Sequence, residues 1–490
     1  MHDHSLLETQ GQHAHHILED LLAHPVTRRI LGRIMRRGAG GTSFFERLCR
    51  NYNNPDLSPA DRWKWRIPEL SIDYALKRAN LDRDVMTERL FHHVPTVRSL
   101  VLAGRSIARY GLSAPQRFVA PLMVVWNITQ ACNLSCRHCY QKATAKPGPD
   151  ELTLAEKLSV VDQLGDAGVP FLAIAGGEPL VSKDLWPVLE RAKERGIHTS
   201  LATNGTLLSR SNVARLLAAG VKYVEVSVDS IIPHEHDEFR GHPGAWHRSI
   251  QGIRHSVEGG MRTGYATCFT SQTVSTVDEA VRFAILLGCR TFSHFNFIPV
   301  GRGEEIEDDD LTPTQREWLL RRLVAHLQEG KINVISTAPQ FGRACVAYAP
   351  PDGIFAAGHA GSGPGSKTMI LSRYVGGCGA GRCYCSIQPN GDVTPCVYIS
   401  GLKVGNLKYQ SLEDIFECSL FGVLSDRTDR RNHCVVCNER AYCGGCRARA
   451  LAYSDDIRSG DPGCRRNQDM WDQMSLRRGR GKPDLMRIAM

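Results

Sequence analysis

Three cysteines, Cys132, Cys136 and Cys139, lie within eight residues of one another in a CxxxCxxC spacing. Two neighbouring cysteines can form a disulfide or half of a zinc site. Three thiols with no fourth nearby favour a metal centre that keeps one coordination position open, such as an iron–sulfur cube held by three thiolates. Because thiolates also bind zinc, the spacing alone leaves a zinc site as the alternative.

A second group of cysteines lies near the C-terminus and has the paired spacing of a metal-binding domain. Cys434 and Cys437 form one CxxC unit, and Cys443 and Cys446 form another. The same region also contains Cys378, Cys383, Cys385, Cys396 and Cys464. Paired CxxC units bind either iron–sulfur clusters or zinc, so this region is predicted to hold metal.

Glycines and polar residues stand where several expected strands end. The expected strand over 171–177 runs into a GGEP motif, which consists of Gly176, Gly177, Glu178 and Pro179. Glycine allows a close backbone approach, and carbonyl and carboxylate oxygens suit an ammonium group. The next two expected strands end near Asn204, Ser227 and Asp229. Polar side chains at the carboxyl ends of barrel strands converge on one opening, so these residues are candidates for a single site.

The elements that must position these residues alternate between strand and helix. Apolar, β-branched runs predict strands over 122–129, 171–177, 198–204, 223–229, 264–270 and 291–299. Helical spacing predicts helices between them over 154–167, 184–196, 211–219, 245–259 and 276–288. Strict alternation predicts a parallel sheet with helices outside it, so the expected fold class is α/β, with a partial (β/α)₆ TIM-like barrel. The CxxxCxxC loop then follows the first strand, where such barrels place their chemistry.

Composition divides the chain into five expected parts. Residues 1–120 form a helical, basic accessory region, with helices expected over 14–19, 25–37 and 94–110 and a break at 38–41. Residues 121–305 form the barrel, and 306–370 form a linker with a helix over 311–329 and a flexible loop over 349–367. Residues 371–470 form a cysteine-rich domain with a hairpin over 387–395, and 471–490 form a basic tail.

The overall composition is that of an ordinary globular protein with an unusual number of cysteines. The chain has 490 residues, a formal net charge of +9 and 17 cysteines. It shows no secretory signal and no apolar run long enough to cross a membrane, so its thiols indicate metal binding in a reducing cytoplasm. The scattered Cys49, Cys268, Cys289, Cys345 and Cys418 are expected to pack as small apolar residues. No nucleic-acid-binding motif is present.

With these motifs in place, residues 120–470 resemble the radical S-adenosylmethionine (radical SAM) superfamily, and the C-terminal part resembles its SPASM domain. The resemblance implies that Cys132, Cys136 and Cys139 hold a [4Fe–4S] cluster whose free iron binds S-adenosylmethionine (SAM). It implies two auxiliary [4Fe–4S] clusters. One would be held by Cys434, Cys437, Cys443 and Cys464, and the other by Cys378, Cys396, Cys446 and either Cys383 or Cys385. The gap between Cys443 and Cys446 is one residue shorter than is usual in the family.

The same resemblance implies which residues contact SAM. The GGEP motif, Gly176, Gly177, Glu178 and Pro179, would grip the amino group of the methionine moiety. Ser227 and Asp229 would face the ribose or the carboxylate, with Asn204 at the same opening. His138 stands where the family often has an aromatic residue that packs on the adenine. These cofactor-binding residues are expectations from the family pattern.

The resemblance further implies a radical reaction. An electron from a flavodoxin- or ferredoxin-like donor would cleave SAM, and the resulting 5′-deoxyadenosyl radical would oxidise a substrate. Members that resemble this chain mostly modify peptide or protein side chains, and that is the first expectation. Some oxidise haem-precursor propionates, so a small molecule, including a lipid, is the alternative.

Two observations keep other classes open. The basic N-terminal region shows no wing strands of a peptide-recognition domain, and its amphipathic helices equally suit a membrane-surface partner. A non-catalytic iron–sulfur electron carrier or a zinc scaffold would also use the cysteines. The GGEP motif argues against both, because neither needs a group that binds an ammonium.

Overall fold

The computed structural model describes residues 19–477 apart from residue 21 and the segments 39–40, 79–81 and 359–360. The His-rich start, most of the helix expected over 14–19, part of the break expected at 38–41 and residues 478–490 of the basic tail lie outside the described residues. Among the described residues, no helix is both long and apolar enough to span a membrane.

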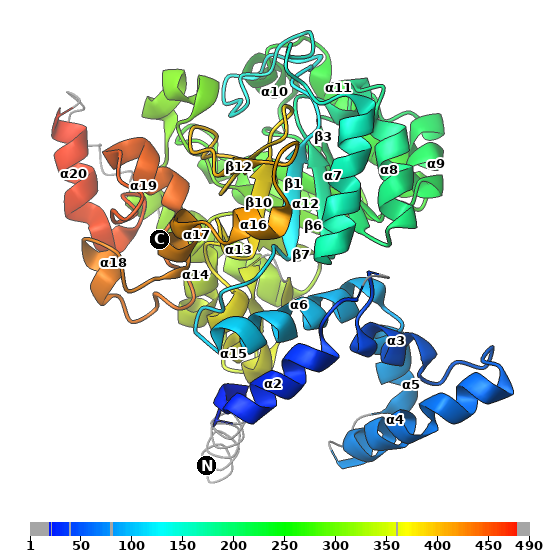
Figure 1. Cartoon of the computed structure of the whole chain (residues 1–490). Coiled ribbons are helices and arrows are strands. Elements are labelled where there is room, and N and C mark those ends of the chain that lie inside the picture. Colours follow the sequence, from blue (N-terminus) through cyan, green and yellow to red (C-terminus); the bar gives the residue numbers. More distant parts are fainter. Residues whose placement is uncertain (1–18, 21, 39–40, 79–81, 359–360, 478–490) are drawn as a thin grey trace.

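The six expected strands are present and form the centre of one parallel sheet, which confirms the α/β class and the partial (β/α)₆ barrel (Figure 1). They pair in chain order, as β1 (Met123–Asn127), β2 (Phe171–Ala175), β3 (His198–Thr203), β4 (Tyr223–Ser227), β5 (Thr263–Cys268) and β6 (Thr291–Phe295). The helices of these units are α7 (Leu154–Ala167), α8 (Leu185–Glu194), α9 (Arg210–Ala218), α10 (Pro233–Arg240), α11 (Ala245–Glu258) and α12 (Val277–Leu286).

Local sequence signals fix where these helices begin and end. In α7 the Thr153 side chain accepts a hydrogen bond from the Glu156 N–H, and the Glu156 carboxylate accepts one from the Thr153 N–H, which is a capping box. The helix ends at Gly168, whose φ of 82° lies in the left-handed region that glycine adopts most readily. Apolar residues from the strands and helices form one large core, in which Trp126, Ile174, Leu201 and Val226 are fully buried.

The segment expected as a linker over 306–370 instead extends the sheet. Helix α13 (Pro313–Glu329) is present as expected, but it leads into strand β7 (Asn333–Ser336), which pairs parallel with β6. The stretch expected as a flexible loop over 349–367 contains a two-stranded hairpin and the start of a helix. These elements are β8 (Ile354–Ala356), β9 (Ser362–Pro364) and α15 (Gly365–Val375), and α14 (Gln340–Tyr348) precedes them.

The cysteine-rich region joins the same sheet at its opposite edge. Strand β10 (Tyr384–Ile387) pairs parallel with β1, and an antiparallel hairpin confirms the turn expected over 387–395. The remaining elements are β11 (Asp392–Thr394), β12 (Gly405–Asn406), α16 (Leu412–Phe416), α17 (Ser419–Ser425), α18 (His433–Val436), α19 (Arg447–Ser454) and α20 (Gln468–Arg477). The barrel and the cysteine-rich region are therefore parts of one continuous sheet, because β10 covers the edge of β1.

The N-terminal region is helical, as expected, and lies below the barrel in Figure 1. Cys49, Tyr52, Leu76, Phe91 and Val97 form a small core of their own. The elements are α2 (Pro25–Ile34), α3 (Phe44–Asn51), α4 (Pro59–Arg78), α5 (Arg83–Met86), a π-helical turn over Thr87–Phe91 and α6 (Val94–Tyr110). Short 3₁₀ turns elsewhere in the chain cover Pro179–Val181, Val274–Thr276, Gly301–Asp309 and Arg465–Asn467.

Candidate active site

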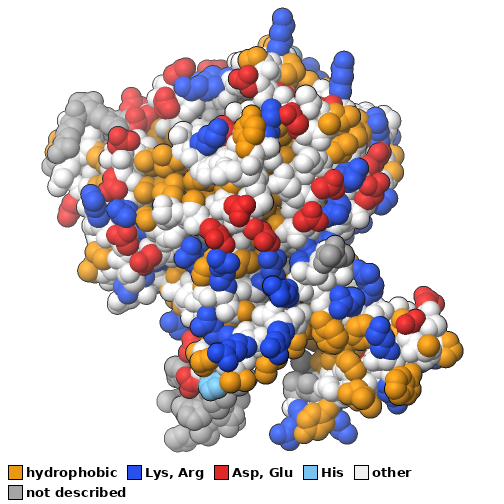
Figure 2. All heavy atoms as spheres, viewed as in Figure 1, with side chains coloured by type: hydrophobic (Ala, Val, Ile, Leu, Met, Phe, Trp, Pro, Cys, Tyr) orange, Lys and Arg blue, Asp and Glu red, His pale blue; other side chains and the backbone are white. Residues whose placement is uncertain are grey.

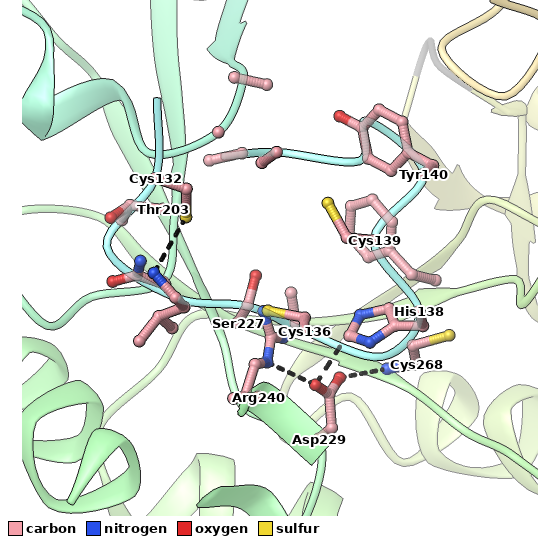
Figure 3. A pocket seen from close by; sticks show the side chains of 18 of the residues that line it. Cys132, Cys136, His138, Cys139, Tyr140, Thr203, Ser227, Asp229, Arg240 and Cys268 are labelled. Atoms are coloured by element: carbon pink, nitrogen blue, oxygen red, sulfur yellow. Dashed lines mark hydrogen bonds and ion pairs between the residues drawn. The ribbon is translucent and has the colours of Figure 1, made fainter. Parts of the chain in front are cut away.

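The CxxxCxxC loop follows β1 and forms one wall of a pocket at the carboxyl ends of β1–β6 (Figure 3). Cys132, Cys136 and Cys139 all line this pocket, so the structure brings the three thiols to one space. The Cys132 N–H donates to the Thr144 carbonyl over 2.7 Å, which holds the loop against the segment that follows it. The other lining residues include His138, Gly176, Gly177, Asn204, Ser227 and Asp229, each of which sequence motifs had predicted.

The two glycines of the GGEP motif are required by the cysteine loop itself. Gly176 has a φ of 142°, and a Cβ there would lie 2.6 Å from the Thr129 carbonyl oxygen. A Cβ on Gly177 would lie 2.1 Å from the Ala131 carbonyl oxygen. Both distances are far below van der Waals contact, so only glycine lets the end of β2 pass the start of the cysteine loop.

Among the residues of the GGEP motif, Gly176 and Gly177 line the pocket, and Glu178 and Pro179 are not among its lining residues. The Glu178 carboxylate accepts hydrogen bonds from Thr203 Oγ1 at 2.7 Å and from the Asn204 N–H at 2.8 Å. It also caps the following turn by accepting from the Leu180 N–H at 3.1 Å. Glu178 is fully buried and ties the end of β2 to the end of β3, so in this structure its carboxylate positions the pocket wall.

A buried cluster of charged groups surrounds the second cysteine. Arg240, at the end of α10, forms an ion pair with Asp229 at 2.6 Å and donates to Cys136 Sγ at 3.7 Å. His138 Nε2 lies 3.9 Å from the Asp229 carboxylate, and its ring stacks on Phe239 with centroids 4.4 Å apart. Figure 3 shows His138 and Arg240 meeting Asp229 from different sides. The expected residues His138 and Asp229 therefore belong to one network.

Burial and charge set the protonation of this cluster. Burial alone would raise the pKa of Asp229, but Arg240 and the neighbouring histidines hold that pKa below its usual value. Burial lowers the pKa of His138 to about 4, so its ring is neutral at pH 7. Asp229 therefore remains a carboxylate that keeps the Arg240 guanidinium beside Cys136.

Burial raises the pKa of the Cys132 thiol to about 12 and raises that of Cys136 as well. Both thiols are therefore protonated at pH 7 in the bare protein. A metal that binds them must displace these protons, and the Arg240 guanidinium and the Leu134 N–H, 3.4 Å from Cys132 Sγ, are placed to stabilise the thiolates. The site thus provides thiolate ligands together with N–H donors, a donor set that suits an iron–sulfur cluster.

Asn296, just after β6, lines the pocket, and two arginines fix the orientation of its amide group. Its Oδ1 accepts from Arg449 Nη2 at 2.7 Å and from Arg316 Nη1. Two arginine donors require an oxygen at this position, so the Nδ2 group points elsewhere. Asn296 is 1% exposed, it lines the pocket, and its Nδ2 has no hydrogen-bond partner among the described residues. A buried donor without a partner is costly, so this atom fits a bound polar ligand.

Some of the C-terminal thiols lie close enough to affect one another's pKa values, and the two sets of four ligands implied by the resemblance remain a prediction. Burial raises the pKa of Cys396 further above its usual range, and Cys378 and Cys446 lie close enough to contribute. Burial likewise raises the pKa of Cys443, with further contributions from Cys464 and Cys434. Cys437, in the loop after α18, belongs to the same CxxC unit as Cys434.

The position of strand β10 bears on whether Cys383 or Cys385 is the fourth ligand of the second auxiliary group. Cys385 lies within β10, opposite Val124 of β1, and is fully buried in the main core. Its pKa is raised by burial alone. Cys383 precedes the strand, and it contributes, with Cys378 and Cys443, to the pKa of Arg427, which burial lowers. Cys383 is buried in the same core as Cys385, and it is among the thiols that affect the pKa of Arg427.

Tyrosines lie between the two cysteine regions. Tyr140 follows Cys139, and Tyr398 is two residues after Cys396, and both line the pocket. Their rings meet edge to face with centroids 5.1 Å apart. The Tyr140 hydroxyl donates to Asn127 Oδ1 over 3.1 Å, which fixes its ring above the end of β1. The pocket is therefore closed on one side by the cysteine-rich region.

Sequence reasoning missed several pocket residues. Arg240 lies between the strand expected over 223–229 and the helix expected over 245–259, and Asn296 lies inside the strand expected over 291–299. Neither was assigned a role, because their roles depend on contacts with distant segments. Cys268 was expected to pack as an apolar residue, but it lines the pocket, and its N–H donates to Asp229 Oδ1 over 3.0 Å. A cysteine at the end of a barrel strand was the available signal.

Comparison with known protein families shows which families this chain matches. Residues 126–310 match the radical SAM superfamily, and residues 378–447 match an iron–sulfur cluster-binding domain known as SPASM. The first match covers the barrel strands β2–β6 and the cysteine loop, and the second covers most of the auxiliary thiols.

Individual relatives match this chain over most of their own length. The AdoMet-dependent heme synthase of Methanosarcina barkeri is 32% identical over 70% of this chain and 96% of its own. The mycofactocin maturase MftC of Mycolicibacterium smegmatis is 28% identical over 74% of this chain and 87% of its own. In fold, the chain is similar to Streptococcus suis SuiB bound to S-adenosylmethionine, with a TM-score of 0.60, 19% identity and coverage of 86% of this chain and 93% of SuiB.

Proposed function

Because this chain belongs to the radical SAM superfamily and carries its SPASM domain, we propose that it is an enzyme that oxidises the propionate side chain of a haem-precursor tetrapyrrole. Its cofactors are [4Fe–4S] clusters and SAM. When bound, they supply a 5′-deoxyadenosyl radical that removes a hydrogen atom from the substrate. The match to 96% of the length of a heme synthase, over 70% of this chain, supports this substrate class.

We assign the roles of the chain's own residues as follows. Cys132, Cys136 and Cys139 are the ligands of the SAM-binding cluster, and Arg240 stabilises the Cys136 thiolate. The backbone at Gly176 and Gly177 and the side chain of Ser227 form the walls that hold SAM. His138 is neutral at pH 7 and stacks on Phe239, so it offers an uncharged aromatic edge to the adenine.

The C-terminal thiols are assigned to two auxiliary clusters. Cys434, Cys437, Cys443 and Cys464 hold one, and Cys378, Cys396, Cys446 and Cys383 hold the other, with Cys385 packed in the core. An acidic flavodoxin- or ferredoxin-like protein supplies the electron, and a reducing cytoplasm suits the 17 free thiols. Residues 1–120 form an accessory region whose basic surface suits an anionic partner.

A second candidate substrate is a peptide side chain. It is favoured by the match to a mycofactocin maturase over 87% of that protein. The N-terminal helices lack the strands of a winged-helix domain among the described residues, which supports the tetrapyrrole as the first candidate.

The test is anaerobic reconstitution with iron and sulfide, followed by SAM and dithionite. We expect about twelve iron atoms per chain and steady formation of 5′-deoxyadenosine. Cys136→Ala should lower the iron content to about eight and abolish 5′-deoxyadenosine, because only the SAM-binding cluster is lost. Cys289→Ala, in the core away from the pocket, is the matched control and should retain both.

Mass spectrometry of candidate substrates from the same assay identifies the substrate class. An iron-containing tetrapyrrole that carries propionates should lose a carboxyl group in a SAM-dependent manner. If SAM is cleaved but only a peptide encoded near this chain changes mass, the peptide candidate holds. If 5′-deoxyadenosine never forms and Cys136→Ala changes nothing, the enzyme assignment fails.

A further inference from the structure

A second cavity, of about 580 Å³, lies outside the active-site pocket. Three segments that are distant in sequence form its wall. They are residues 113–117 after α6, Arg373 near the end of α15, and residues 422–441 around α17 and α18. Four arginines line it, Arg117, Arg373, Arg427 and Arg440, and Asp426 is the only acidic residue of the lining. The cavity is therefore strongly basic.

These arginines differ in their contacts. Arg427 is buried and holds the fold together, whereas Arg373 and Arg440 are more exposed and form what we call the arginine rim. Arg427 is buried and donates to the carbonyls of Gly376 and Cys378 and to those of Arg440 and Ala441. Its N–H groups are thus committed to the fold and do not converge on a small anion. Arg373 is exposed and Arg440 is half-buried, with one contact to the exposed Val435 carbonyl at 3.3 Å. The available positive charge lies on the rim, where a large partner can meet it.

The cavity lies beside both groups of auxiliary thiols. Asn438 follows Cys437, and Ala441 is two residues before Cys443. On the other side, Arg427 reaches the Cys378 carbonyl at 3.4 Å. A partner seated in this cavity would be separated from the auxiliary thiols only by these short segments of chain.

The surface around the cavity continues the same charge. Figure 2 shows Lys and Arg side chains gathered below the barrel, where α2, α6 and α15 lie in this view. Arg117 packs over the Tyr110 ring at 4.3 Å, which places a guanidinium between α6 and the cavity. A rim charge that extends over neighbouring elements fits an extended acidic protein surface better than one small anion.

We propose that this cavity and its arginine rim are the docking site of an acidic ferredoxin, and this inference rests on the proposed function. After the hydrogen atom is removed, the substrate radical breaks its bond to the carboxylate carbon, releases CO₂ and forms a C=C bond. One electron is left over. The ferredoxin, in its oxidised form, accepts that electron and is reduced by one equivalent. The reaction therefore needs a one-electron acceptor, and the clusters that the auxiliary thiols beside the cavity would hold could pass the electron to an acceptor docked there.

The charge arrangement predicts how binding depends on salt and on the rim. Exposed charges steer association and are screened within about 8 Å at physiological ionic strength. The ferredoxin Kd should therefore rise steeply between low and high salt. Reversing the charge at Arg373 and Arg440 replaces attraction by repulsion without removing the contacts that Arg427 makes.

The experiment measures binding of an acidic bacterial ferredoxin to the reconstituted holoenzyme by calorimetry. The double variant Arg373→Glu/Arg440→Glu should raise the Kd at least tenfold. Arg210→Glu is the matched control and should change the Kd less than twofold, because this side chain is 73% exposed on α9 and forms an ion pair with Glu258. SAM cleavage driven by dithionite should be unchanged in all three proteins, because dithionite needs no docking site.

Three outcomes would decide against the docking site. A double variant that binds ferredoxin like the wild type overturns the proposal. So does a flavodoxin that binds at this rim while ferredoxin does not, or inorganic phosphate that binds tightly there with no ferredoxin binding. If ferredoxin binding depends on the rim but dithionite yields no 5′-deoxyadenosine, the proposed function fails and the docking site stands, so the two failures are distinguishable.

Discussion

At the scale of single residues, several polar side chains of the pocket are held in one orientation by hydrogen bonds and ion pairs to other residues. Asn296 illustrates this, because two arginines fix its amide oxygen and leave its buried Nδ2 group without a hydrogen-bond partner among the described residues. Asp229 is similar, since Arg240 keeps it ionised beside the cysteine loop. The pocket therefore presents oriented donors before any ligand arrives, which lowers the cost of binding.

Asn296→Asp tests the role of the Nδ2 donor. The carboxylate still accepts from Arg316 and Arg449, so the fold should be preserved, but the donor to the ligand is lost. We expect the Kd for SAM to rise about tenfold, as for one lost hydrogen bond, while the thermal midpoint changes little. Equilibrium dialysis of SAM with the reconstituted enzyme measures this. An unchanged Kd would show that Nδ2 does not contact SAM.

At the scale of elements, the cysteine loop and the end of β2 are built as one unit. The Gly177 N–H donates to the Thr129 carbonyl over 2.7 Å, and the Glu178 N–H donates to the Ala131 carbonyl over 2.8 Å. The GGEP motif thus anchors the loop that carries the thiols by backbone contacts. This explains why glycine is needed there without reference to a ligand.

Gly177→Ala should disrupt this unit. The new Cβ would lie 2.1 Å from a backbone oxygen, so the chain must shift and the cysteine loop must move with it. We expect a loss of about 2–4 kcal/mol in stability and a lower iron content of the SAM-binding cluster. Gly401→Ala, which has nothing within 4 Å of its Cβ, is the control and should be neutral. Thermal unfolding and iron analysis give the answer, and a stable, fully loaded Gly177→Ala variant would contradict the close approach.

At the scale of the whole molecule, the barrel and the cysteine-rich region share a buried polar interface. Arg449 of α19 is fully buried and contacts Asn296 and the Phe297 carbonyl at the end of β6. It also lies 3.4 Å from Asp310, which Arg316 of α13 contacts at 2.6 Å. The auxiliary region thus reaches the pocket wall directly.

Arg449→Met should loosen this interface. The change leaves Asp310 and Asp461 short of one buried positive charge, at a cost of about 3–5 kcal/mol. We expect a lower unfolding midpoint and faster proteolysis between the barrel and the cysteine-rich region. Lys403→Met is the control, because Lys403 is 55% exposed in its pair with Asp392. Equal protease sensitivity of the two variants would show that the interface does not depend on Arg449.

The local parts of this structure could be predicted from the sequence. The strands β1–β6 and helices such as α7 were predicted because apolar periodicity and caps such as Thr153 act within a few residues. The sequence placed β7 in a linker and gave no sign that β10 pairs with β1, since a short strand acquires its partner only when the chain folds.

The three cysteines of the CxxxCxxC loop show the same difference between local features, which the sequence predicts, and long-range contacts, which it does not. The sequence by itself determined that Cys132, Cys136 and Cys139 share one loop after a strand, because their spacing is a local property. Only the tertiary structure decided that Arg240 and Asn296 join them and that the Glu178 carboxylate bonds Thr203 and Asn204. Those outcomes depend on contacts between residues tens to hundreds of positions apart, and a local pattern contains no information about such contacts.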